Sequence, residues 1–130
     1  MSTGGAGGVD PELAAFIEAA IPSVWALETL ILLKRDSGSA WTADQLVAEM
    51  RASTTLVANC LTALQRAGLV LEQQGAVWYA PAAPALAVLS DRLQDTYRER
   101  PVSVVNIIAK RRADPLKGFA DSFRLGGWKT

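Results

Sequence analysis

The sequence predicts a mainly α-helical fold with one small β-hairpin, and three observations lead to this expectation. Apolar residues recur at helical spacing in several segments that are separated by proline, glycine and polar turns. Only two short strand-like runs occur, 69–72 and 76–79, and Gln73-Gln74-Gly75 between them is typical of a hairpin. Half of the 130 residues are hydrophobic and a fifth are charged, so a hydrophobic core can form.

The first helices are predicted from their start signals. Residues 1–9 are rich in glycine and small polar residues and are expected to form a disordered tail. Asp10-Pro11-Glu12 then begins an N-terminal helix, 10–21, because it offers a capping oxygen, a proline in the first turn and an acid at the positive end. A second helix begins at Ser23 and ends around Lys34-Arg35.

Two further helices precede the hairpin. Thr42 is a suitable N-cap for a short helix, and Ser53 is one for a longer helix that Gly68 ends. The longer helix carries one apolar stripe at i, i+3, i+4 and i+7, which predicts that one face is buried. The stripe consists of Val57, Cys60, Leu61 and Leu64.

Residues 83–125 are expected to form additional helices. Pro84 favours a helix start and Pro101 breaks that helix. The β-branched run 102–108 fits strand or helix, and helix is favoured because Pro101 would then stand at its first turn and Lys110-Arg111-Arg112 at its negative end. A last short amphipathic helix is predicted after Pro115, and 126–130 form a tail. Its apolar side consists of Leu116, Phe119, Ala120 and Phe123.

Residues 22–82 resemble a winged helix-turn-helix domain. The resemblance rests on the segment 46–53, on the apolar positions that follow it, and on Ala67-Gly68-Leu69-Val70 at the entry to the first strand of the hairpin. Trp78-Tyr79 stands where such domains often close the second strand with an aromatic residue. The pattern is similar to that of the MarR, ArsR and Rrf2 families of bacterial regulators. The resemblance implies a winged helix-turn-helix with extra N- and C-terminal helices.

In such families the second helix of the motif enters the major groove of DNA and the wing contacts phosphate. Asn59 would then pair with an adenine edge, and the hydroxyls at 53–55 would meet phosphates. The resemblance therefore implies a small transcriptional regulator of bacterial type that binds duplex DNA as a homodimer. By position, the DNA-contact candidates are Ser53, Thr54, Thr55, Ala58, Asn59, Thr62, Arg66, Gln73 and Gln74.

The charge pattern favours an alternative function. Residues 1–80 contain four Lys/Arg and eight Asp/Glu, a net charge of 4 − 8 = −4. The predicted wing has no basic residue, and Arg51-Ala52 stands where a glycine and a larger apolar residue are usual. Because phosphate neutralisation supplies most non-specific affinity, such a unit would bind DNA poorly alone. The alternative is a winged-helix protein-interaction module that does not bind DNA directly.

The C-terminal part is basic, with nine Lys/Arg and five Asp/Glu in residues 81–130, a net charge of 9 − 5 = +4. These side chains form either a solvated surface or a contact for phosphate or an acidic protein. A basic patch is expected from Lys110, Arg111, Arg112, Lys117 and Arg124.

The terminal helices carry more apolar surface than a winged helix needs. Dimerisation through 10–20 and 84–125 is the leading explanation. The alternatives are that these helices fold back onto their own domain, or that they dock onto another protein. The candidate dimer or partner residues are Phe16, Leu93, Tyr97, Val105, Ile108, Phe119, Phe123 and Trp128.

Several function classes are not expected. The chain has no histidine, no phosphate-binding glycine motif and no cysteine cluster, so we expect no enzyme, no cofactor and no metal. Cys60 is expected to be a small buried hydrophobe, and Trp25, Trp41 and Trp78 to lie in or beside the core. Apolar stretches fall well short of the ~20 residues that cross a bilayer, and no signal peptide is evident. A cytoplasmic protein without membrane contact is therefore expected.

Overall fold

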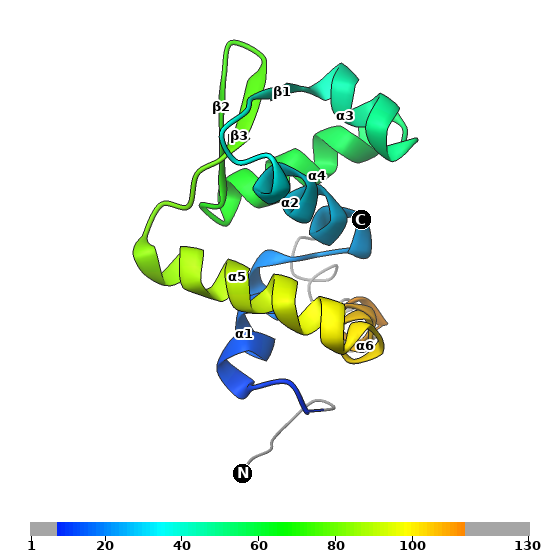
Figure 1. Cartoon of the computed structure of the whole chain (residues 1–130). Helices are drawn as coiled ribbons and strands as arrows, with labels where there is room; N and C mark the ends of the chain where they lie inside the picture. The colour runs from blue at the N-terminus through cyan, green and yellow to red at the C-terminus, as the bar shows by residue number, and fades with distance from the viewer. Residues whose placement is uncertain (1–7, 114–130) are drawn as a thin grey trace, which may run out of the picture.

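The computed structural model describes residues 8–113, with side chains for residues 8–110. This part of the chain is mainly helical with one small antiparallel sheet, as the sequence predicts (Figure 1). The elements are α1 (Pro11–Ala20), α2 (Val24–Arg35), β1 (Trp41–Thr42), α3 (Ala43–Met50), α4 (Thr54–Arg66), β2 (Val70–Gln73), β3 (Ala76–Tyr79), α5 (Pro84–Glu99) and α6 (Pro101–Ala113).

The sheet has three strands in the order β1-β3-β2, all antiparallel. The strand β1 was not predicted: Trp41 pairs with Val77, beside the expected hairpin. The hairpin loop consists of Gln74 and Gly75 alone, since Gln73 pairs with Ala76 as part of β2. Gln74 and Gly75 have φ values of 53° and 83°. Two consecutive residues with positive φ are typical of a type I′ turn, which matches the twist of the strands.

The predicted caps at Asp10, Thr42 and Ser53 are confirmed, and Ser23, where a helix start was predicted, is the N-cap of α2. The Asp10 carboxylate accepts hydrogen bonds from two backbone N–H groups of α1, and Ser23 accepts one from α2. Thr42 and Gln45 form a reciprocal capping box at the start of α3. Ser53 Oγ accepts from the backbone of α4 at 3.0 Å. Each cap satisfies a donor that the helix leaves unpaired.

The helix α4 ends in a glycine turn. Gly68 has φ +77°, its N–H donates to the Gln65 carbonyl, and the Leu69 N–H donates to the Leu64 carbonyl. This pair of bonds is a Schellman motif. A Cβ at position 68 would lie 3.3 Å from the Ala82 Cβ, so the chain after the hairpin also returns close to this turn.

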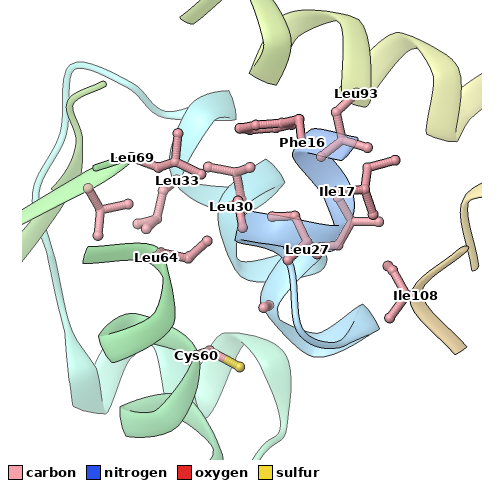
Figure 2. Close-up of a cluster of buried hydrophobic side chains, with 14 of the residues drawn as sticks. Phe16, Ile17, Leu27, Leu30, Leu33, Cys60, Leu64, Leu69, Leu93 and Ile108 are labelled. Atoms are coloured by element: carbon pink, nitrogen blue, oxygen red, sulfur yellow. The ribbon is translucent and has the colours of Figure 1, made fainter. Parts of the chain in front are cut away.

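The core forms where α1, α2, α4, α5 and α6 meet. Figure 2 shows their apolar side chains converging, with Leu27, Leu30 and Leu33 contributed by α2. All three leucines are at most 1 % exposed. Burial of one such side chain stabilises the fold by about 1.5–3 kcal/mol, before the loss of conformational entropy is counted.

The outer helices are tied to the rest of the chain by polar contacts. Arg92 on α5 forms ion pairs with Asp10 at 2.8 Å and with Glu12 at 3.2 Å. Tyr97, near the end of α5, donates a 2.7 Å hydrogen bond from its hydroxyl to Glu28 on α2. These contacts hold α5 against α1 and α2.

Two expectations on the termini are tested by the described residues, and a third is not. The 102–108 run is helical, because it lies within α6, which begins at Pro101. Val9 was expected in the disordered tail, but it is 1 % exposed and belongs to the core. The helix predicted around 116–123 and the tail 126–130 lie outside the described residues.

The helices α1 and α2 are the most apolar pair in sequence. Among the helices of residues 8–113, none is by itself long and apolar enough to cross a membrane. Only α1 and α2 taken together reach that length and composition, and the chain bends by 101° between them.

Candidate nucleic-acid interface

The helix α4 has two faces of opposite character. The predicted stripe is buried, with Val57, Cys60 and Leu64 at most 3 % exposed, and it packs against α2. On the opposite side, four small residues at i, i+3, i+4 and i+7 are exposed, so they share one straight face. This outer face of α4 consists of Thr55, Ala58, Asn59 and Thr62.

The polar side chains of this outer face have no protein partner within residues 8–113. Asn59, Thr55 and Thr62 form no hydrogen bond with a described group, whereas Ser53 is engaged in capping its own helix. The exposed Thr54 likewise forms no side-chain hydrogen bond within this part of the chain. The donors and acceptors of these side chains are therefore available to a ligand.

The charges around α4 are few and unevenly placed. Residues 41–79 contain two basic residues, Arg51 and Arg66, and three acids, a net charge of 2 − 3 = −1. The helix itself has no acid. Arg51 precedes it and Arg66 lies in its last turn; both are exposed, and neither forms an ion pair among the described residues. Along the chain, the neutral outer face is thus flanked by two unpaired cations.

Much of the negative charge of residues 1–80 lies away from α4. Asp10 and Glu12 are paired with Arg92, and Glu28 accepts the hydrogen bond of Tyr97. The hydrogen bond from Arg92 lowers the pKa of Asp10 below its usual value. The net charge of −4 is therefore spread over several elements and does not describe the outer face of α4.

The hairpin supplies the remaining contact candidates. Gln73 and Gln74 are exposed at its tip, and Leu71 is 53 % exposed. Figure 1 shows α3 and the hairpin at one end of the molecule, and α1, α5 and α6 at the other. Glu72 accepts a 2.9 Å hydrogen bond from Gln65 of α4, which joins the hairpin to the helix.

The predicted partner residues fall into three groups. Phe16, Leu93 and Ile108 are a correction: they are at most 8 % exposed and lie in the chain's own core, so they offer no surface to a partner. Tyr97 and Val105 are half-buried. Phe119, Phe123 and Trp128 lie outside the described residues. The sequence reasoning missed Val102, which is 70 % exposed at the start of α6.

The predicted basic patch is described only in part. Lys110 is exposed near the end of α6. The backbone of Arg111 and Arg112 continues this helix, but their side chains lie outside the described set, as do Lys117 and Arg124 entirely. The patch stays a prediction.

A shallow hollow of about 340 Å³ lies beside α2 and the end of α3. Trp25 was expected in or beside the core, but it is 43 % exposed at the rim of this hollow. The aromatic residue faces outward because the inner side of α2 is occupied by leucines. The lining residues are Trp25, Glu28, Ile31, Leu32, Arg35, Glu49 and Met50.

The described residues offer hydrogen-bonding groups more than reactive ones. Burial raises the pKa of the Cys60 thiol, which disfavours the thiolate. No group of three or more metal-binding side chains occurs within residues 8–113.

Comparisons with protein-family models, with curated proteins and with solved structures give no match to this chain. Within the described residues, the outer face of α4 is therefore the candidate functional site.

Proposed function

We propose that α2 to β3 form a winged-helix domain that binds duplex DNA, with α4 in the major groove. The element order α2, β1, α3, α4, β2, β3 and the hairpin beside α4 support the winged-helix assignment. The observation that carries the proposal is the outer face of α4, which is exposed, uncharged and free of described partners. A face of this kind suits base edges, which are read by hydrogen bonds and methyl contacts.

The dimensions and charges of α4 fit this placement. A helix with its side chains is about 10–12 Å across and the major groove is about 12 Å wide, so α4 can enter it, and its 13 residues span about 20 Å at 1.5 Å per residue. Arg51 and Arg66 stand at the two ends of the outer face, where the phosphates that border the groove would lie. The cations would then contact phosphate, while Asn59 lies over the bases.

The number of cations predicts weak binding by a single copy. Each phosphate contact contributes a slope of about −0.9 to the dependence of log K on log salt concentration. Arg51 and Arg66 therefore predict a slope near −2 for one domain. We propose that the protein acts as a homodimer, because two copies on a two-fold symmetric site double the number of contacts.

A titration of labelled duplex DNA, followed by fluorescence anisotropy at several salt concentrations, tests the function. Saturable binding that weakens with salt is expected. Arg66→Gln should reduce the salt slope by about 1 for each bound copy, because each copy loses one phosphate contact. The matched control is Arg100→Gln, an exposed arginine at the junction of α5 and α6. Absence of binding at low salt would contradict the proposal.

A second candidate is a protein-interaction module, and the exposed Trp25 favours it. A half-exposed tryptophan beside Ile31 and Met50 resembles an interface anchor. Glu28 and Glu49 outweigh the charge of Arg35 in the lining of the same hollow, which would suit a basic partner. If the protein binds no DNA, capture of a partner by the wild type and loss of that partner with Trp25→Ala would support this function.

A further inference from the structure

We infer that the outer face of α4 selects A·T base pairs, with Asn59 on adenine and methyl groups of its neighbours against thymine. The inference rests on the proposed DNA binding and names the base pairs that the helix would prefer. Two observations support it: the side chains that share the exposed face of α4, and the residue types that this face lacks.

The Asn59 amide suits adenine. A carboxamide donates and accepts at once, so it can accept from adenine N6 and donate to adenine N7 in the major groove. Asn59 is exposed near the middle of α4, and its amide has no partner within residues 8–113. No rearrangement of described contacts is needed to free the amide for a base.

The side chains around Asn59 carry methyl groups that suit thymine. Thr55, Ala58 and Thr62 are exposed on the same face of the helix, and each side chain carries a methyl group. The C5-methyl of thymine is the apolar group of the major groove, and alanine and threonine methyls are suited to contact it. From Thr55 to Thr62 the helix rises about 10 Å, which corresponds to about three base pairs.

The outer face of α4 lacks the residue types that commonly read G·C pairs. Guanine is commonly read by arginine or lysine at O6 and N7, and cytosine N4 by a carboxylate. Between positions 53 and 65 the chain has no basic residue, and α4 has no acid. Arg51 and Arg66 lie beyond the two ends of the reading face. The threonine hydroxyls can bond to any base pair, so discrimination falls to Asn59 and the methyl groups.

Three duplexes of equal length separate the possible modes of reading. One contains only A·T pairs, one only G·C pairs, and one only inosine·cytosine pairs. Inosine·cytosine presents the major-groove pattern of G·C and lacks the guanine amino group in the minor groove. A helix that reads the major groove should bind the A·T duplex about tenfold more tightly than both others in competition anisotropy. Replacement of thymine by uracil, which removes only the methyl group, should weaken binding about threefold or more.

Two substitutions connect the preference to Asn59. Asn59→Ala should reduce the A·T preference several-fold, and Asn59→Arg should shift it toward G·C pairs. The control is Asn106→Ala, an exposed asparagine on α6 that should leave the preference unchanged. Circular dichroism verifies that each variant is folded.

The outcomes are distinguishable. Equal affinity for A·T and G·C duplexes would overturn the inference and leave the proposed DNA binding intact. Equal affinity for A·T and inosine·cytosine duplexes would place the readout in the minor groove and would also overturn it. Absence of binding to every duplex would overturn the proposed function together with the inference.

Discussion

Lys34 of α2 forms a 2.6 Å ion pair with Asp91 of α5, and its ammonium lies 4.9 Å from the centre of the Tyr79 ring. The lysine side chain is 10 % exposed, whereas that of Asp91 is 66 % exposed. One nearly buried cation thus joins α2, the last strand of the sheet and α5. The contact fixes α5 relative to the elements that carry the candidate interface.

Removal of Asp91 should destabilise the fold more than removal of an ordinary surface acid. Asp91→Ala leaves the Lys34 ammonium with the ring of Tyr79 and little water, and we expect a loss of about 1 kcal/mol in the free energy of unfolding. The estimate stays low because Asp91 itself is well exposed. Lys34→Met, which keeps the packing and removes the charge, should cost less. Urea unfolding measures each value.

The control for this prediction is Asp95→Ala. Asp95 pairs with Arg98 within α5, and the two side chains are 62 % and 67 % exposed, so its removal should change stability by less than about 0.5 kcal/mol. Equal effects of the Asp91 and Asp95 substitutions would contradict a special role for the Lys34 contact.

The hydrogen bond from Tyr97 to Glu28 predicts a loss of stability at high pH. This bond, with some burial, raises the pKa of Tyr97 from 10.0 to about 12. The folded chain therefore holds the phenol proton more tightly than the unfolded chain, and this contribution is complete below pH 10.0. It should be lost as the pH rises from 10.0 to about 12.

Tyr97→Phe tests this pH dependence, because it removes the titrating group and keeps the ring. The stability of wild type should fall more steeply across the alkaline range than that of the variant. Tyrosinate absorbance, followed in Tyr79→Phe so that only Tyr97 titrates, should shift to lower pH when Glu28→Gln is added. Parallel stability curves for wild type and Tyr97→Phe would refute the prediction.

The hairpin turn predicts opposite effects at its two residues. Gln74 has φ 53°, a conformation that asparagine adopts more readily than glutamine, so Gln74→Asn should stabilise the fold by about 0.5 kcal/mol. Gly75 has φ 83°, and a Cβ added there would meet no other atom, so the cost of Gly75→Ala, about 1 kcal/mol, comes from the backbone. Thermal unfolding compares the two. An unchanged melting temperature in Gly75→Ala would be inconsistent with the type I′ turn.

Local signals explain which parts of the fold were predictable. The caps at Asp10, Ser23, Thr42 and Ser53 are each decided by residues within one helical turn, so the sequence displays them directly. The strand β1 is different. Its two residues show no periodicity, and Trp41 becomes a strand residue only by pairing with Val77.

In the candidate site, too, features set by local sequence were predictable and features set by distant contacts were not. The buried stripe of α4 predicts its exposed opposite face, because helical geometry links the two. Apolar character alone predicts that a residue is buried but not against which surface. Phe16, Leu93 and Ile108 were therefore expected to meet a partner, yet they pack inside their own chain. Ion pairs such as Arg92 with Asp10 join residues far apart in sequence and have no local signal.

Arg51 provides a prediction in which stability and binding change in opposite directions. It caps the C-terminal end of α3 in the left-handed conformation, with φ 56° and its N–H bonded to the Val47 carbonyl. An L-residue is strained there by about 1 kcal/mol, and glycine is the usual occupant. Arg51→Gly should therefore raise the free energy of unfolding by about 0.5 kcal/mol, after allowance for the entropy of glycine in the unfolded chain.

The same substitution removes one of the two unpaired cations that flank the outer face of α4 in the sequence, so DNA affinity should fall and the salt slope should decrease by about 1 for each bound copy. Arg51→Lys keeps both the strain and the charge and should change neither quantity much. Greater stability with undiminished DNA affinity in Arg51→Gly would show that Arg51 does not contact phosphate. A simultaneous gain in stability and loss of affinity would indicate that the strained arginine is retained for its charge.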